Sequence, residues 1–168
     1  DALASTHPVR CRVANAEQAT ENFDAITYEK GGALLRMLEG FLGEQSFQRG
    51  IQAYMQRYRF DNTVADDLWN ALAEASGQPI SEIANRWLGR GGYPVLSLSR
   101  IGRRIILRQQ RFVLDPEAPD ADLPWVVPVV IRYQHAQGVK SRSLLMRGPT
   151  IAIELESDAL QVFVHVLE

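Results

Sequence analysis

The 168-residue sequence has little cysteine and little histidine. Its only cysteine, Cys11, cannot form a disulfide within the chain or build a thiolate cluster around a metal. This scarcity leaves the redox compartment undecided, because secreted proteins without disulfides exist, and the cytoplasm is the compartment we favour. No apolar run approaches the ~20 residues of a membrane-spanning helix, so we expect no membrane partner.

The sequence has almost no excess of either sign of charge. The formal net charge is −2, which gives no reason to expect a nucleic-acid partner or an anionic membrane. Apolar residues make up 46% and charged residues 23%, the balance of a globular protein with one ordinary domain or two small ones. The N-terminal DALASTHPVRC is no signal peptide, and it lacks an initial Met. We therefore expect a chain cut from a longer one, although processing would give the same ends.

Several catalytic motifs are missing. A His-Glu-x-x-His zinc site places two histidines one helical turn apart, and no such pattern occurs. The three histidines are His7, His135 and His165. Their spacing suggests no shared metal, so we interpret them as ordinary surface or half-buried residues. A Gly-x-Ser-x-Gly elbow, a phosphate-binding loop and a dinucleotide fingerprint are absent as well.

Two charged clusters have plain interpretations. The acidic residues are Asp115, Glu117, Asp120 and Asp122, and the basic residues are Arg100, Arg103, Arg104, Arg108 and Arg111. The acidic cluster lacks the glycine and terminal glutamate of an EF-hand loop, so we interpret it as a solvated loop. The arginines lie in strand-like sequence without interleaved aromatic residues, which favours a solvated sheet face over a nucleic-acid site.

Residues 24–91 have the pattern of four short amphipathic helices. The apolar stripes of the first two are Tyr28, Leu35, Leu38 and Leu42, then Phe47, Ile51, Tyr54, Met55 and Tyr58. Gly43 is the expected stop of the first helix, and Ser46 the expected N-cap of the second. Thr63 and Asp66 have capping-box spacing, and the third helix should end at Gly77. The fourth starts at Pro79 with Ile80, Ile83 and Trp87 on one side.

The apolar period changes from helical to alternating at Gly91. The alternating positions are Leu96 and Leu98, then Ile151, Ile153 and Leu155, then Val162, Val164 and Val166. With the β-rich runs RRIILRQQRF and WVVPVVIRY, these predict about five antiparallel strands in a sheet or sandwich. Helices followed by strands indicate an α+β fold with two domains, 1–91 and 92–168.

Tyr28 is the position at which ordinary and functional interpretations compete. A tyrosine on the apolar stripe of a helix is most often a core residue with a hydrogen-bonded hydroxyl. However, Gly31 and Gly32 follow at offsets of three and four, and each lowers helix propensity by roughly 1 kcal/mol. Glycines at these offsets would let a backbone or a ligand approach the phenol closely. These features mark the position as unusual without naming a reaction.

The segment from Phe23 to Leu72 resembles the aminopeptidase N family of zinc metallopeptidases. The matching residues include Phe23-Asp24, Ile26 to Gly31, Phe41 to Glu44, Phe47, Gly50-Ile51, Tyr54 and Asp67 to Trp69. Upstream, THP resembles the family's Ser-His-Pro segment, and downstream, NRWLGRGGYPV resembles its Trp-x-x-x-x-Gly-x-Pro passage. The likeness is strong to about residue 97 and weak after about residue 135.

The resemblance implies the helical C-terminal part of a thermolysin-like catalytic domain, followed by an antiparallel β-sandwich domain. It maps the family's transition-state tyrosine onto Tyr28, whose protonated phenol would donate a hydrogen bond to the oxyanion formed during peptide hydrolysis. The family's zinc ligands lie upstream of that tyrosine and are not in this chain, so Zn²⁺ would be a cofactor of the parent enzyme. Gly32 stands where the family more often has alanine.

The leading interpretation is therefore part of a zinc aminopeptidase that removes N-terminal residues from peptides. Its partners would be a peptide substrate and the remainder of the same polypeptide, and the isolated chain would be inactive. The alternative is a non-catalytic homologue, or a scaffold module for domain packing or partner binding. A nucleic-acid module using the arginine-rich strand is a third interpretation that we do not favour, and salt-sensitive binding would be its signature.

Overall fold

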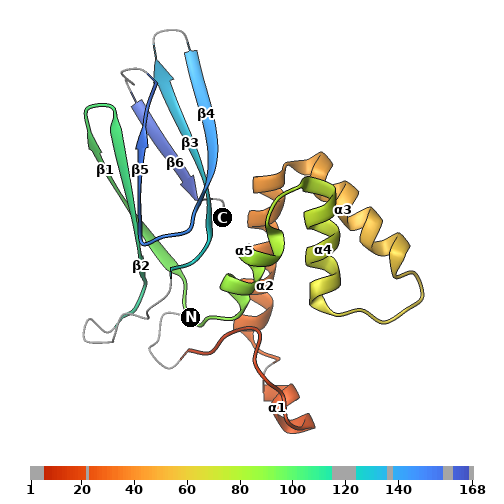
Figure 1. Cartoon of the computed structure of the whole chain (residues 1–168). Coiled ribbons are helices and arrows are strands. Elements are labelled where there is room, and N and C mark those ends of the chain that lie inside the picture. The colour runs from red at the N-terminus through yellow and green to blue at the C-terminus, as the bar shows by residue number, and fades with distance from the viewer. Residues whose placement is uncertain (1–5, 22, 115–123, 136–137, 157–160, 167–168) are drawn as a thin grey trace.

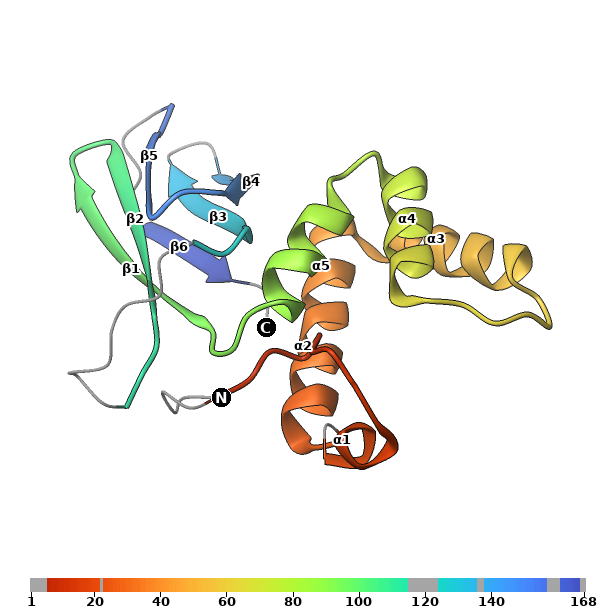
Figure 2. The ribbon, with the colours of Figure 1, turned by 60° about the horizontal axis from the view of Figure 1, so that its bottom comes forward.

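Helices precede strands in the part of the chain that the structure describes. The computed structural model describes residues 6–21, 23–114, 124–135, 138–156 and 161–166. The helices are α1 (Ala16–Glu21), α2 (Ala25–Leu42), α3 (Glu44–Arg57), α4 (Ala65–Ser76) and α5 (Ile80–Leu88). The strands are β1 (Pro94–Ile101), β2 (Arg104–Arg111), β3 (Val127–His135), β4 (Gly138–Met146), β5 (Thr150–Glu154) and β6 (Gln161–Val166). Figures 1 and 2 show the strands gathered on one side and the helices on the other, which confirms the α+β expectation.

Glycines end two of the helices, as the sequence predicted. Gly43 has φ 77°, and its N–H donates to the Glu39 carbonyl over 2.8 Å, which closes α2. Gly77 has φ 67° in the left-handed region and donates to the Ala73 carbonyl over 2.8 Å, which closes α4. A residue with a Cβ is strained at such positive φ values, so glycine fits both stops.

Two of the three expected helix starts were displaced, whereas Pro79 lies at the start of α5 as expected. Ser46 does not cap α3, because Gly43 ends α2 and directly begins α3 with no loop between them. The α4 cap lies one residue later than predicted: the Asp67 carboxylate accepts from the Val64 backbone N–H over 2.9 Å. The Thr63 hydroxyl instead shares a hydrogen bond of 2.6 Å with the Tyr54 hydroxyl. Helix α1 was not predicted.

The helical core includes most of the predicted α2 stripe, because Leu38 is buried and the partly buried Leu35 and Leu42 pack against the core. The buried residues of α2 are Leu34, Met37 and Leu38, and they pack with Trp69, Leu72, Ile80, Ile83, Ala84 and Leu88. Tyr28 is instead exposed, and so is Met55 of α3. At Gly50 the backbones of α3 and α4 approach so closely that a Cβ would lie 2.7 Å from Leu72 Cδ2.

The strands form two three-stranded antiparallel sheets, in the orders β1-β2-β5 and β4-β3-β6. Ile105 pairs with Ile153 in the first sheet, and Ile131 pairs with Val164 in the second. One core joins both sheets, with Ile105, Leu107 and Ile153 from the first and Val127, Val129 and Ile131 from the second. The acidic residues Asp115, Glu117, Asp120 and Asp122 lie outside the described residues.

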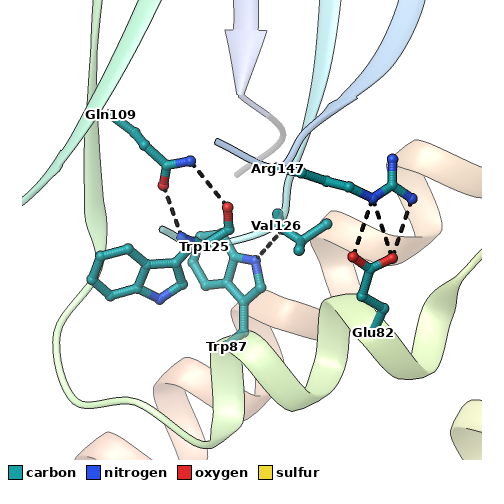
Figure 3. Close-up of polar contacts among 6 residues, drawn as sticks. All are labelled: Glu82, Trp87, Gln109, Trp125, Val126 and Arg147. Atoms are coloured by element: carbon teal, nitrogen blue, oxygen red, sulfur yellow. Dashed lines mark hydrogen bonds and ion pairs between the residues drawn. The ribbon is translucent and has the colours of Figure 1, made fainter. Parts of the chain in front are cut away.

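Helix α5 connects the helices to the sheets (Figure 3). Its Trp87 donates from Nε1 to the Val126 carbonyl over 2.8 Å, and its Glu82 accepts from Arg147 Nε over 3.1 Å. Gln109 holds the same segment from the sheet side. Its side-chain amide bonds the backbone N–H and C=O of Trp125 over 2.9 and 3.0 Å. These contacts fix α5, and the helices packed on it, against the start of β3.

Candidate functional site

Tyr28 lies in the first turn of α2, and the residues just before it in the sequence form the start of this helix. Asp24 is the N-cap, and its Oδ1 accepts from the Thr27 backbone N–H over 2.9 Å. Phe23, just before the cap, packs edge-to-face on Tyr28 with ring centroids 5.3 Å apart. This is the arrangement of a hydrophobic staple, which fixes the angle at which the chain enters a helix. The Phe-Asp-x-x-x-Tyr pattern therefore orients the Tyr28 ring.

The phenol ring faces open space. Tyr28 is 62% exposed, and it lines a hollow of about 520 Å³ with Glu29, Gly32, Ala33 and Arg36. A Cβ built on Gly31 or Gly32 would meet no atom within 4 Å, leaving aside chain neighbours and the helix's own backbone. The open space that the sequence predicted beside the ring is thus present in this chain. Tyr28 does not belong to the core of the chain, which was the alternative interpretation.

A second hollow runs along the same helix toward the sheets. It measures about 510 Å³, and its lining residues are Ala25, Ile26, Glu29, Lys30, Ala33, Leu34, Met37, Trp87, Tyr93 and Pro94. Glu29 and Ala33 line both hollows. The exposed surface of α2 therefore has one hollow on each side of Glu29 and Ala33. The hollow nearer the sheets is lined mainly by apolar residues.

Lys30 binds the linker between α5 and β1. Its Nζ donates to the Arg90 carbonyl over 2.6 Å and to the Gly92 carbonyl over 2.7 Å. Burial lowers the pKa of Lys30 to about 8, and the positive charges of Arg111 and Arg90 act in the same direction. Sequence reasoning gave Lys30 no structural role, since its partners lie about sixty positions away.

His7 is joined to the N-cap of the same helix. Its Nε2 lies 2.8 Å from Asp24 Oδ2, and its Nδ1 lies 3.0 Å from the Pro8 carbonyl. Both contacts raise the pKa of His7, and the contact with the Pro8 carbonyl has the larger effect. The pKa of Asp24 is lowered, mainly by the hydrogen bond from the Thr27 N–H and next by the contact with His7. His7 is half-buried, as the expectation of a surface or half-buried histidine allowed, and its Nε2 lies within ion-pair distance of Asp24. The side chains of His135 and His165 lie outside the described part of the structure.

The described residues do not fit a zinc site. Among them, no group of three or more His, Cys, Asp or Glu side chains is placed to hold a metal ion. Two members of the arginine-rich stretch bind backbone carbonyls: Arg103 at Leu155 and Arg100 at Gly102. In the same part of the chain, no helix has the length and apolar character needed to cross a membrane.

Comparison with known proteins identifies the family. The model of the Peptidase family M1 domain matches residues 1–87, which is more than half of the sequence and includes Tyr28 and most of α5. The chain belongs to peptidase family M1. This agrees with the resemblance to aminopeptidase N-type enzymes, and aminopeptidases of family M1 are zinc metallopeptidases.

The relatives of this M1 chain include proteins named aminopeptidases from distant organisms. Probable aminopeptidase 2 of Sulfurisphaera tokodaii is 36% identical over 166 residues, covering 99% of the chain and 20% of the relative. Alanine/arginine aminopeptidase of Saccharomyces cerevisiae is 33% identical over 158 residues, covering 94% and 18%. Human glutamyl aminopeptidase is 40% identical over 135 residues, covering 77% and 14%. The M1 chain thus spans at most about a fifth of the length of these relatives.

Proposed function

We propose that this chain is part of a longer zinc-dependent aminopeptidase, to which it supplies Tyr28 as the oxyanion-stabilising residue. Membership of family M1 and relatives named aminopeptidases support peptide hydrolysis as the reaction. The observation that carries the role of Tyr28 is its position: exposed, oriented by Phe23, and beside an opening that two glycines leave free.

The proposed role is electrostatic. Hydrolysis of a peptide bond converts the scissile carbonyl oxygen into an oxyanion as the carbonyl carbon becomes tetrahedral. A phenol O–H aimed at that oxygen stabilises the charge most strongly in the transition state. No proton leaves Tyr28 in this role.

The zinc of the proposed enzyme would be bound outside this chain. The described residues provide no ligand set, so we assign the ion to the remainder of the polypeptide. The isolated chain is then inactive, with the remaining polypeptide and a peptide substrate as its partners. We also propose that residues 1–91 close the catalytic domain and that 92–168 form the β-sandwich domain. The last helix ends at Leu88 and the first strand starts at Pro94, on either side of this boundary.

The test compares the full-length protein that contains this chain with the 168-residue chain alone. The zinc-loaded full-length protein should release N-terminal residues from peptides, and a chelator should abolish that release. The isolated chain should release none under the same conditions. A zinc-loaded, folded full-length protein without aminopeptidase activity would instead identify a non-catalytic homologue, in which this region serves packing or partner binding.

A further inference from the structure

The segment before α1 contacts three other parts of the molecule: the end of α5, the linker that follows it and the start of α2. The Arg10 backbone N–H donates to the Leu88 carbonyl at the end of α5 over 2.8 Å. Farther along the linker, a Cβ on Gly91 would lie 2.8 Å from Thr6 Cγ2, so the two backbones are in close contact. His7, between Thr6 and Arg10, reaches Asp24 at the start of α2. The segment 6–10 therefore packs between the start of the Tyr28 helix and the linker that follows α5.

Both ring nitrogens of His7 face acceptors. The Pro8 carbonyl can only accept, so Nδ1 must carry a proton to bond it. Asp24 is held ionised, because its other oxygen accepts from the Thr27 N–H and its pKa is lowered. A carboxylate cannot donate, so Nε2 must carry a proton as well. A neutral imidazole has a single N–H, and only the imidazolium satisfies both contacts.

We propose that His7 is a positioning residue for Tyr28, and that it acts as an imidazolium through Asp24. Asp24 defines where α2 begins, and its backbone carbonyl accepts from the Tyr28 N–H over 3.3 Å. Phe23, the neighbour of Asp24, packs on the Tyr28 ring. A shift of Asp24 therefore moves both the backbone and the ring contact that orient the phenol. The catalytic part of this inference rests on the function proposed for Tyr28, whereas the ion pair does not.

The charged groups near His7 set the direction of its pH dependence. Asp24 favours the imidazolium, and Lys30, which lies on the same helix, opposes it. The net effect raises the pKa of His7 above its usual value. The ion pair is therefore complete below the raised pKa, and it loses one hydrogen bond as the pH rises through that value. The position of Tyr28 should loosen over the same interval.

The ion pair can be tested on the 168-residue chain by following the His7 ring signals with pH in NMR spectra. We expect His7 to titrate above the ~6.5 of a free histidine. Asp24→Asn should return the value toward normal, and asparagine keeps the N-cap that α2 needs. The matched control is Asp66→Asn, which removes the partner of Arg10 on the same segment and should leave His7 unchanged. A His7 that titrates at or below 6.5, or is insensitive to Asp24→Asn, overturns the proposal.

The positioning role is tested in the full-length enzyme with His7→Gln, which can donate one of the two hydrogen bonds. We expect kcat to fall by roughly tenfold with KM nearly unchanged, as for a misplaced catalytic group. The decline of wild-type kcat above the His7 pKa should disappear in the variant. In a Tyr28→Phe background, His7→Gln should have little further effect, because the hydroxyl that it positions is gone. Asp24→Asn should show the same dependence on the background.

A merely structural His7 would lower kcat by the same factor in both backgrounds, and that result overturns the positioning role. If the folded, zinc-loaded wild-type protein had no aminopeptidase activity, the proposed function would be refuted. The catalytic part of this inference would be refuted with it. The His7 titration would still decide the ion pair, so the two failures are distinguishable.

Discussion

Gly32 lies one helical turn after Tyr28, inside α2, where glycine is unfavourable. A Cβ at Gly32 would meet no other atom within 4 Å. Gly32→Ala should therefore stabilise the 168-residue chain by up to about 1 kcal/mol, through improved helix propensity alone. Urea unfolding of the two proteins measures this difference directly.

The matched control for this prediction is Gly50→Ala. Its Cβ would lie 2.7 Å from Leu72 Cδ2 and 3.0 Å from Leu72 Cα, so α3 and α4 would have to move apart. Overpacking of this kind costs roughly 1–3 kcal/mol. If Gly32→Ala destabilised the chain as Gly50→Ala does, the surface beside Tyr28 would not be open.

Lys30 gives a pH-dependent prediction because its pKa is lowered to about 8. Between about pH 8 and its unfolded value near 10.4, the unfolded chain holds a proton on Lys30 that the native chain has lost. The free energy of unfolding should therefore rise with pH across that window. The groups around Lys30 are Arg90 and Arg111, which oppose its charge, with Glu29 in the same hollow.

The measurement is the difference in urea unfolding free energy between wild type and Lys30→Met at several pH values from 7 to 10. The difference should shift in favour of wild type as the pH rises, because methionine keeps the packing and has no proton to lose. Groups that titrate identically in both proteins cancel. A difference that stays flat, or shifts toward Lys30→Met, would show that the carbonyls of Arg90 and Gly92 offset the burial of the ammonium.

The sequence indicated some of the site residues and not others. Tyr28 and its glycines share one helix, so their spacing predicted a common open surface. Lys30 contacts Gly92 across 62 positions, and His7 contacts Asp24 across 17. No helical or strand period connects such partners, and a lone histidine or lysine is usually a solvated side chain. Their roles required the three-dimensional structure.

At the scale of elements, helix stops were predicted better than helix starts. Glycine is uniquely tolerant of the positive φ at a stop, whereas several residues near a helix start can serve as the cap. Strand β4 was missed because most of its residues are exposed, which removes the alternation on which the prediction depended. The other five strands have an alternating apolar or β-rich sequence and were anticipated.

Helix α5 supplies a prediction about the contact between helices and sheets. Trp87→Phe keeps an aromatic ring in place but removes the indole N–H. That N–H donates a partly buried hydrogen bond of 2.8 Å to the Val126 carbonyl. We expect a loss of about 1 kcal/mol in the free energy of unfolding, the usual net contribution of one hydrogen bond. Thermal and urea unfolding of the chain provide the measurement.

The comparison variant is Glu82→Gln, which weakens the exposed pair with Arg147 on the same helix. Exposed ion pairs typically contribute 0 to about 1 kcal/mol, so this change should cost less. A larger loss from Glu82→Gln than from Trp87→Phe would place the main contact of α5 with the sheets at the ion pair instead.

At the scale of the whole molecule, the order of helices and strands followed from the change of apolar period near Gly91. The way in which the two parts meet did not follow, since Val126 joins the helical core from the sheet side. Trp87, from the helices, packs against the cores of both parts. A residue that serves two cores has no distinctive pattern in a single sequence.

The whole chain should bind no zinc stoichiometrically, because the described residues offer no ligand set. The measurement is metal analysis after exposure to excess zinc and dialysis, with the full-length protein as the positive control. One tightly held zinc per isolated chain would contradict the assignment of the metal to the remainder of the polypeptide.

The central claim is that the Tyr28 hydroxyl stabilises the transition state, and Tyr28→Phe in the full-length enzyme tests it most directly. Phenylalanine keeps the ring and its contact with Phe23, so only the hydroxyl is lost. We expect kcat to fall about 10²- to 10³-fold, which corresponds to roughly 3–4 kcal/mol, with much less change in KM. Zinc content and thermal unfolding, measured alongside, should match wild type. Near-normal kcat together with a lowered melting temperature would make Tyr28 a structural residue and contradict the account.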